Sequence, residues 1–446
     1  MHAEIHTFPC EGGEILRVQL VRLQSWQQLE FLAPLPSENA FESFDRVYRQ
    51  FLIPGCPWIF GNVVLFRLPE ELAQAVPPSP RRVGAVADPL TAAAAVLRRG
   101  VRMVGAKPVF TGRAVRDFWH ALEKRDCLRF VRGKLPMTTI IPVGNAAGYL
   151  SETEPDAELK ANASFFIMDP FDCATVYDHV GEPFGMRVKD GFVESPPLFG
   201  REALLVHTDG CVSVEPVDIR QMEIEIDGRR YRHGENAVLY TRPEHRRTPP
   251  NKGTKLVVVG CRVAAVSRRA RVEVPASGFV LCAEDTCAVR PGDAVTYHGM
   301  ENVAFGLQVG NSIVRSGQPT TAFVSRFYNI RKLEKTPFPP SLYPMDFAGA
   351  RAARMALGAD AEGRPMLLWA EGAGKLGYTP GTDSCGASLA DMARVCCALG
   401  MVNGVNLDGG GSAQILLHGR RALRISDRKT DNTDSERPVP QGLIVR

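Results

Sequence analysis

The sequence has no long apolar run, no basic leader and no metalloprotease-type histidine motif. No stretch is long and apolar enough to cross a bilayer, so we expect no membrane span. Met1 is followed by His2, Glu4 and His6 instead of a basic patch and an apolar core, so we expect no signal peptide. The nine histidines include no His-Glu-x-x-His pair. These absences predict a cytoplasmic protein without a histidine-based metal centre.

Charge and cysteine content narrow the class further. The formal charge of +4 over 446 residues gives no reason to expect nucleic acid or an anionic membrane as a partner, whereas small anions stay open. The 11 cysteines form no regular framework, and several, such as Cys261 and Cys396, lie in apolar surroundings. This pattern favours buried, reduced thiols. Cys282 and Cys287 are spaced to pair or to bind a metal, but no second pair accompanies them.

The most informative stretch is residues 405–413, VNLDGGGSA. Apolar residues flank three consecutive glycines, which predicts a strand, a glycine loop and a second strand. Glycines leave backbone N–H groups uncovered, and successive amides form a concave nest for an anion. A tight turn between strands is the plain alternative. The loop is not a P-loop, because no lysine follows the glycines.

A helix is predicted immediately before this loop. Residues 388–391, SLAD, resemble a capping box with Asp in place of Glu or Gln. Apolar residues then recur at helical spacing to Leu399, and Gly400 provides a stop. We expect this helix to pack against the strand and to fix the direction of Asp408.

Residues 406–412, NLDGGGS, resemble the signature of the phosphodiester glycosidase family. Weaker resemblances follow in the expected order over about residues 130 to 446. They are ANASFF (161–166), PFGMRVKDG (183–191), LYT (239–241), IVRSG (313–317), ARMALG (353–358) and ERPV (436–439). The resemblance implies hydrolysis of the glycosidic C–O bond in a sugar-1-phosphodiester, with a small-molecule glycosyl phosphodiester as partner.

The resemblance and the chemistry together suggest site residues. The catalytic candidates are Asp408, with Glu436 and Glu371 as further carboxylates. The substrate-binding candidates are Arg354 as a phosphate clamp, then Asn162, Phe166, Asn406, Gly409, Gly410, Gly411 and Ser412. Each has a plain alternative: an Asp turn residue, an ion pair, a backbone hydrogen bond or strand core. No cofactor is expected, and a divalent cation at Asp408 has no support in the sequence.

Three positions depart from the family pattern. Ala163 and Ser164 stand where two glycines are usual, Glu371-Gly372-Ala373 replaces an expected Asp-Gly-Arg, and Gly310-Asn311 replaces a glycine pair. These changes leave the sugar open, and a nucleotide sugar, a sugar-1-phosphate diester and a biosynthetic intermediate are all compatible. Two rival functions remain: a metal-dependent phosphodiesterase that cleaves P–O, and a non-catalytic sugar-phosphate binding protein.

We predict an α+β fold, with a mixed, largely antiparallel sheet, packed helices and an N-terminal α/β extension. Residues 1–130 have no assigned role, and residues 131–446 form the glycosidase-like domain. Helical stripes are expected near residues 41–51, 88–100 and 115–122. Residues 15–21 alternate like a strand and could instead be the first strand of the main fold. Three Asp-Gly pairs, at 190, 209 and 227, predict hairpin turns.

Overall fold

The computed structural model describes most of residues 148–446 and the first strands of the chain. Apart from isolated residues, the described ranges are 1–10, 13–34, 148–167, 183–198, 200–242, 244–284, 288–321, 347–373, 378–429 and 431–446. Four further strands are placed between them: β4 (Val63–Phe66), β5 (Val101–Val104), β6 (Lys107–Phe110) and β7 (Thr139–Pro142). The helical stripes predicted near 41–51, 88–100 and 115–122 lie outside the described residues.

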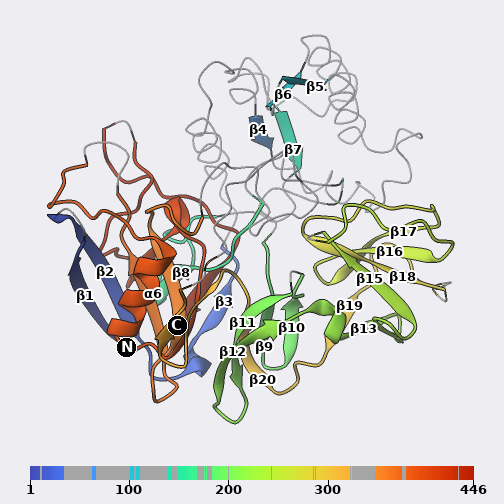
Figure 1. Cartoon of the computed structure of the whole chain (residues 1–446), viewed down its shortest axis with the longest axis horizontal. Helices are drawn as coiled ribbons and strands as arrows, with labels where there is room; N and C mark the ends of the chain where they lie inside the picture. Colours follow the sequence, from blue (N-terminus) through green and yellow to red (C-terminus); the bar gives the residue numbers. More distant parts are fainter. Residues whose placement is uncertain are drawn as a thin grey trace.

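The largest sheet has seven strands and joins the two ends of the sequence (Figure 1). Its order is β1 (His2–Pro9), β2 (Ile15–Arg22), β24 (Pro365–Ala370), β23 (Arg354–Ala359), β25 (Asn403–Asn406), β21 (Ser312–Arg315) and β22 (Gln318–Pro319). All neighbours pair antiparallel, and β2 aligns Leu20 with Leu368 of β24. The strand predicted over residues 15–21 is therefore present and lies inside the sheet of the C-terminal part.

Four further sheets have three to five strands each. A four-stranded sheet holds β26 (Ile415–Leu417), β8 (Leu159–Asn162), β27 (Gly442–Val445) and β3 (Glu30–Leu32). A five-stranded sheet holds β10 (Phe192–Ser195), β9 (Arg187–Lys189), β20 (Val303–Leu307), β11 (Arg201–His207) and β12 (Val212–Val217). A three-stranded sheet holds β14 (Arg229–Arg232), β13 (Glu223–Ile226) and β19 (Val295–His298). A second four-stranded sheet holds β15 (Ala237–Thr241), β18 (Gly278–Ala283), β16 (Thr254–Val259) and β17 (Arg262–Ser267).

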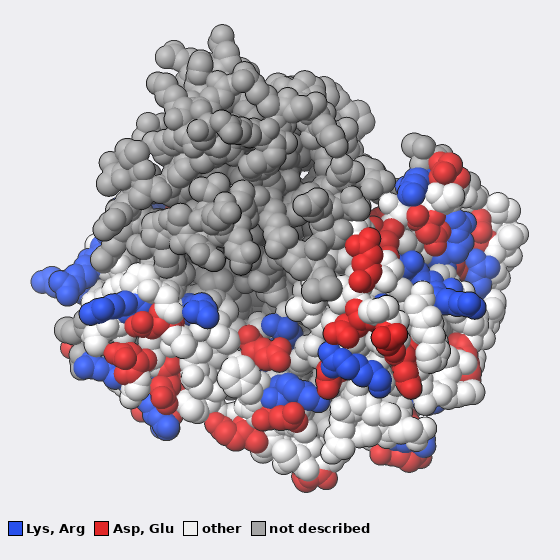
Figure 2. All heavy atoms as spheres, turned by 180° about the vertical axis from the view of Figure 1, so that it is seen from behind, with Lys and Arg blue, Asp and Glu red and all other residues white. Residues whose placement is uncertain are grey.

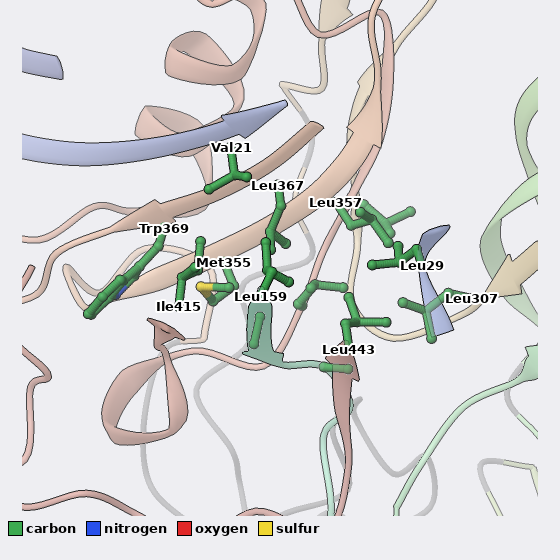
Figure 3. Packing of buried hydrophobic residues seen from close by; sticks show 14 of the residues in the cluster. Val21, Leu29, Leu159, Leu307, Met355, Leu357, Leu367, Trp369, Ile415 and Leu443 are labelled. Atoms are coloured by element: carbon green, nitrogen blue, oxygen red, sulfur yellow. The ribbon is translucent and has the colours of Figure 1, made fainter. Parts of the chain in front are cut away.

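Both faces of the central strands β23 and β24 are buried. Side chains alternate along a strand, so Leu367 and Trp369 of β24 enter one core while Leu368 enters another. The first core lies against the four-stranded sheet of β8 and β27, where Leu159 and Leu443 meet Met355 and Leu367 (Figure 3). Burial on both faces explains why β23 and β24 read as continuous apolar runs.

The helix α6 (Leu389–Ala398) covers the second face. The Ser388 side chain accepts a hydrogen bond from the Asp391 amide, and the Asp391 carboxylate accepts one from the Ser388 amide, as the predicted capping box requires. Met392 and Cys396 pack with Leu368 in the second core. Gly400 takes a positive φ of 92° directly after the helix. The predicted capped helix is confirmed.

The predicted α+β class is wrong. Among the described residues, α6 is the one α-helix, and the rest of the regular structure is strands and short 3₁₀ turns. The apolar faces of the strands are covered mainly by other sheets, so few helices are needed. The predicted hairpins did form: Asp190 and Gly191, and likewise Asp227 and Gly228, have positive φ between antiparallel strands.

Replacing Leu20 with Ala tests whether the first strands belong to the main core. Leu20 is 1% exposed on β2, so Leu20→Ala should lower the free energy of unfolding by about 2–5 kcal/mol. The control Ile5→Ala lies on β1 and is 48% exposed, so a change under about 0.5 kcal/mol is expected. Denaturant unfolding of both variants measures the difference. Equal, small effects would show that the strand adds little to the core.

Candidate active site

The glycine loop is tied to two separate parts of the chain. After β25, the amide of Leu407 donates to the Met355 carbonyl (2.9 Å) and the amide of Asp408 donates to the Ala163 carbonyl (2.9 Å). The amide of Gly410 then donates to the Ala353 carbonyl (2.8 Å). Residues 407–410 therefore pass between the start of β23 and the segment that follows β8. The predicted strand, loop and strand are present as β25, η6 (Gly410–Ser412) and β26.

Asn162 fixes both ends of the loop. Its Nδ2 donates to the Asp408 carbonyl (2.8 Å), and its Oδ1 accepts from the Gln414 amide (3.0 Å). The side chain is 1% exposed. This is backbone support, the alternative that the sequence left open beside a sugar contact.

Asp408 carries a buried carboxylate with one unbonded oxygen. Oδ1 accepts from the Gly409 amide (2.9 Å), while Oδ2 has no hydrogen-bond partner. Burial raises the pKa of Asp408 to about 6, and the Ser412 hydroxyl, Arg437, the Gly409 amide and Arg354 oppose that rise. A carboxylate in this setting is largely ionised at neutral pH and has an oxygen available for a reacting group.

The glycine amides are less available than the sequence suggested. The amides of Gly409 and Gly410 already donate to Asp408 Oδ1 and to the Ala353 carbonyl. Gly410 alone of the three has a positive φ, 60°. Two of the three amides predicted to bind a phosphate therefore already donate hydrogen bonds within the protein.

The glycines are needed for close packing. A Cβ on Gly409 would lie 2.6 Å from the Ala353 carbonyl oxygen. A Cβ on Gly411 would lie 2.2 Å from both Arg437 Nη2 and Asp427 Oδ2. The missing side chains let the loop press against β23 on one side and against an ion pair on the other.

That ion pair was missed by the sequence interpretation. Arg437 Nε donates to Asp427 Oδ2 (2.9 Å) and Nη2 donates to Oδ1 (3.2 Å), with both side chains buried. Arg437 also lowers the pKa of Asp408, so its charge acts on the carboxylate. The ERPV stretch contains Arg437 and was a usable signal, whereas no local motif surrounds Asp427.

Arg354 lies at the start of β23, beside the loop. It is buried, and its Nε donates to the Ala387 carbonyl (3.0 Å) and its Nη2 to the Ala350 carbonyl (2.6 Å). Its charge, like that of Arg437, lowers the pKa of Asp408. The structure therefore places the guanidinium near the carboxylate and uses part of it to hold the backbone.

The two other candidate carboxylates have partners of their own. Glu371 Oε2 accepts from Arg17 Nε of β2 (2.6 Å), and Oε1 accepts from the Arg424 amide (2.9 Å). Glu436 Oε2 pairs with Arg421 Nη2 (2.5 Å), and Oε1 accepts from the Ser151 amide (3.1 Å). Asp408 is the candidate carboxylate that retains an unbonded oxygen.

The remaining candidates are buried. Asn406 Nδ2 donates to the Leu407 carbonyl (2.7 Å), and its Oδ1 has no partner. The Ser412 hydroxyl is likewise buried, and it lowers the pKa of the Asp408 carboxylate. Phe166 is 5% exposed and forms a β-bridge with Pro183, as strand core would. Asn406 and Asp408 thus supply unsatisfied polar atoms where β25 runs into the loop.

The described part of the chain holds no group of three or more His, Cys, Asp or Glu side chains placed to bind a metal ion. Among the described residues, no helix has the length and apolar character that crossing a membrane requires. On the face in Figure 2, the described basic and acidic side chains are intermixed.

A known protein family matches the part of the chain that carries the loop. The sequence model described as phosphodiester glycosidase matches residues 252–446. The mouse and human proteins named N-acetylglucosamine-1-phosphodiester alpha-N-acetylglucosaminidase are 38% and 37% identical to the chain over 86 residues. These matches span 19% of this chain and only 15% of the length of each relative.

Two solved structures show weaker similarity. The catalytic domain of the zebrafish N-acetylglucosamine-1-phosphodiester alpha-N-acetylglucosaminidase has a TM-score of 0.41 at 11% identity, covering 100% of this chain and 82% of that chain. A hypothetical protein from Synechocystis has a TM-score of 0.39 at 19% identity, covering 68% of this chain and 55% of that chain.

Replacing Asp408 with Asn tests whether the buried charge of Asp408 destabilises the folded protein. The folded-state pKa of about 6 exceeds the ordinary 3.8, so folding favours the protonated acid. The stability that this proton brings is complete below pH 3.8 and is lost as pH rises through 6. The free energy of unfolding of Asp408→Asn should therefore exceed that of wild type by on the order of 3 kcal/mol at pH 7.5, and by less at pH 4.

Thermal and denaturant unfolding at the two pH values measure this difference. The exposed Asp156 provides a matched control, because Asp156→Asn removes the same charge from the surface. A variant at Asp408 that is less stable than wild type at both pH values would contradict the assignment.

Proposed function

We propose that the chain acts as a phosphodiester glycosidase, the family whose model matches residues 252–446, and that it hydrolyses a sugar-1-phosphodiester at the glycosidic C–O bond. The observation that carries the proposal is the buried Asp408 carboxylate with an unbonded oxygen, held beside two arginines in the matched region. The products would be a free sugar and a phosphate monoester.

The chemistry of this bond matches what the loop offers. Cleavage at the anomeric carbon passes through an oxocarbenium-like state. A phosphate monoester leaves more readily than an alcohol, so a strong proton donor is less important than in ordinary glycoside hydrolysis. The site must instead balance charge that gathers on the phosphate oxygens, and preorganised cations do this most effectively where water is excluded.

Asp408 takes the catalytic role in this proposal. Its Oδ2 either accepts a proton from the attacking water or attacks the anomeric carbon directly. The Gly409 amide holds Oδ1 and so fixes the direction of Oδ2. With a pKa of about 6, the carboxylate is ionised at neutral pH and still basic enough to accept a proton.

The arginines supply positive charge. Arg437 is oriented by Asp427, and Arg354 is oriented by the carbonyls of Ala387 and Ala350. Their fixed orientation means that little reorganisation is needed when phosphate charge develops. Glu371 and Glu436 act as supports in this scheme, because each is engaged by an arginine and a backbone amide.

Hydrolysis in water labelled with oxygen-18 tests which bond breaks. Purified protein is assayed with nucleotide sugars and with alkyl phosphodiesters of sugar 1-phosphates. Cleavage of the C–O bond puts the label in the released sugar. Label in the phosphate would instead establish P–O cleavage, and tight binding without turnover across the panel would favour a binding protein.

The same assay examines Asp408. Asp408→Asn should lower kcat/KM by at least about 100-fold, because a positioned general base contributes that much or more. The surface variant Asp156→Asn should keep wild-type activity. Full activity in Asp408→Asn would remove the carboxylate from the mechanism even if the C–O bond is the one that breaks.

A further inference from the structure

Two cysteines that are far apart in sequence lie in contact. The Sγ atoms of Cys10 and Cys385 are 3.1 Å apart, across 375 positions of the chain. We propose that this pair is a dithiol site that a low-molecular-weight disulfide oxidises to an intramolecular disulfide. The proposal departs from the sequence interpretation, in which the cysteines are reduced core residues, and it does not depend on the proposed function.

The backbone on both sides is already held together. Cys10 directly follows β1, and its amide donates to the Glu14 carbonyl (2.7 Å) across the β1–β2 connection. The amide of Cys385 donates to the carbonyl of Ile15, the first residue of β2 (2.8 Å). A disulfide needs a sulfur–sulfur distance of about 2.05 Å. The sulfurs must approach by roughly 1 Å, which small side-chain rotations provide.

Arg351 places a positive charge against both sulfurs. Its Nη1 lies 3.2 Å from Cys385 Sγ and 3.8 Å from Cys10 Sγ, and it donates to the Gly386 carbonyl (2.9 Å). Asp391 lies 3.4 Å from the same nitrogen. A cation beside a thiol favours the thiolate, which is the form that attacks a disulfide.

The different exposure of the two cysteines sets the order in which they react with the small disulfide. Cys10 is half-buried, whereas Cys385 is buried, and burial raises the pKa of the Cys385 thiol to about 12 while Arg351 opposes that rise. The thiolate of Cys10 therefore attacks first, forms a mixed disulfide with one half of the small disulfide and releases the other half as a thiol. Cys385 then loses its proton, attacks Cys10 Sγ and releases the second small thiol.

The exchange is balanced. Two protein thiols are oxidised to one disulfide, and one small disulfide is reduced to two thiols, so no further oxidant is needed. Arg351 would stabilise the Cys385 thiolate in the second step, where burial alone opposes it.

The bond would tie the N-terminal strands to a segment that supports Arg354. Residues 384–388 contain Ala387, whose carbonyl accepts from Arg354 Nε and whose backbone pairs with Ala352. Ser384 donates to the Glu371 carbonyl (2.8 Å). A cross-link that closes most of the chain also restricts the unfolded state strongly. Oxidation should therefore stabilise the folded protein.

The test uses the 446-residue chain equilibrated in buffers of reduced and oxidised glutathione. Free thiols are blocked by alkylation, and the protein is digested and mapped by mass spectrometry without reduction. We expect a linked peptide containing Cys10 and Cys385 at high oxidised glutathione, together with a higher thermal unfolding midpoint. Mapping by peptide is required because the chain has further cysteines, among them Cys56, Cys127, Cys173 and Cys287 outside the described residues.

Cysteine variants test whether the rise in the thermal unfolding midpoint comes from the disulfide between Cys10 and Cys385. Cys10→Ser and Cys385→Ser should each lose both the linked peptide and the rise in the midpoint. Cys211→Ser, which removes an exposed cysteine outside the pair, should respond like wild type. Three results would overturn the proposal: no linked peptide in wild type at excess oxidised glutathione, a persistent glutathione adduct on Cys10, or an equal rise of the midpoint in Cys10→Ser.

Discussion

The candidate active site depends on the close approach of the glycine loop, residues 409–411, to the buried ion pair of Arg437 and Asp427. Gly411 has no room for a side chain against Arg437 and Asp427, and Gly409 has none against the backbone of Ala353. This packing brings Asp408 into a buried position where one carboxylate oxygen is bonded to the Gly409 amide and the other is not. An ionisable group is costly in such a place unless charges compensate it, and two arginines do so here.

Much of the support comes from distant parts of the chain. Asn162 holds both ends of the loop, and the Ala163 carbonyl accepts a hydrogen bond from the Asp408 amide. This contact uses the backbone of Ala163 and not its side chain. Arg17 of β2 donates a hydrogen bond to the Glu371 carboxylate. The next residue, Gly372, packs closely against the backbone of Ala353, which also contacts the loop. The N-terminal strands are therefore part of the framework around the loop, and the Cys10–Cys385 contact lies in the same framework.

The sequence predicted features that are encoded locally. The capping box at Ser388, the Asp-Gly hairpins and the strand over residues 15–21 each depend on a few neighbouring residues, and the structure contains them. The loop and Asp408 were found because their motif is contiguous. The fold class was wrong because sheet-on-sheet burial is decided by pairing between distant strands. Asp427 was missed for the same reason: its importance comes from Arg437 and Gly411 and not from its own neighbours.

The pH dependence of kcat/KM tests the central claim most directly, since it reports the ionisation of essential groups in the free enzyme. If Asp408 must be ionised and its pKa is about 6, kcat/KM falls tenfold per pH unit below that value. Asp408→Asn should then leave only a low activity in which this limb is absent. A wild-type profile that stays flat down to about pH 4.5, or a variant that keeps the same limb, would contradict the account.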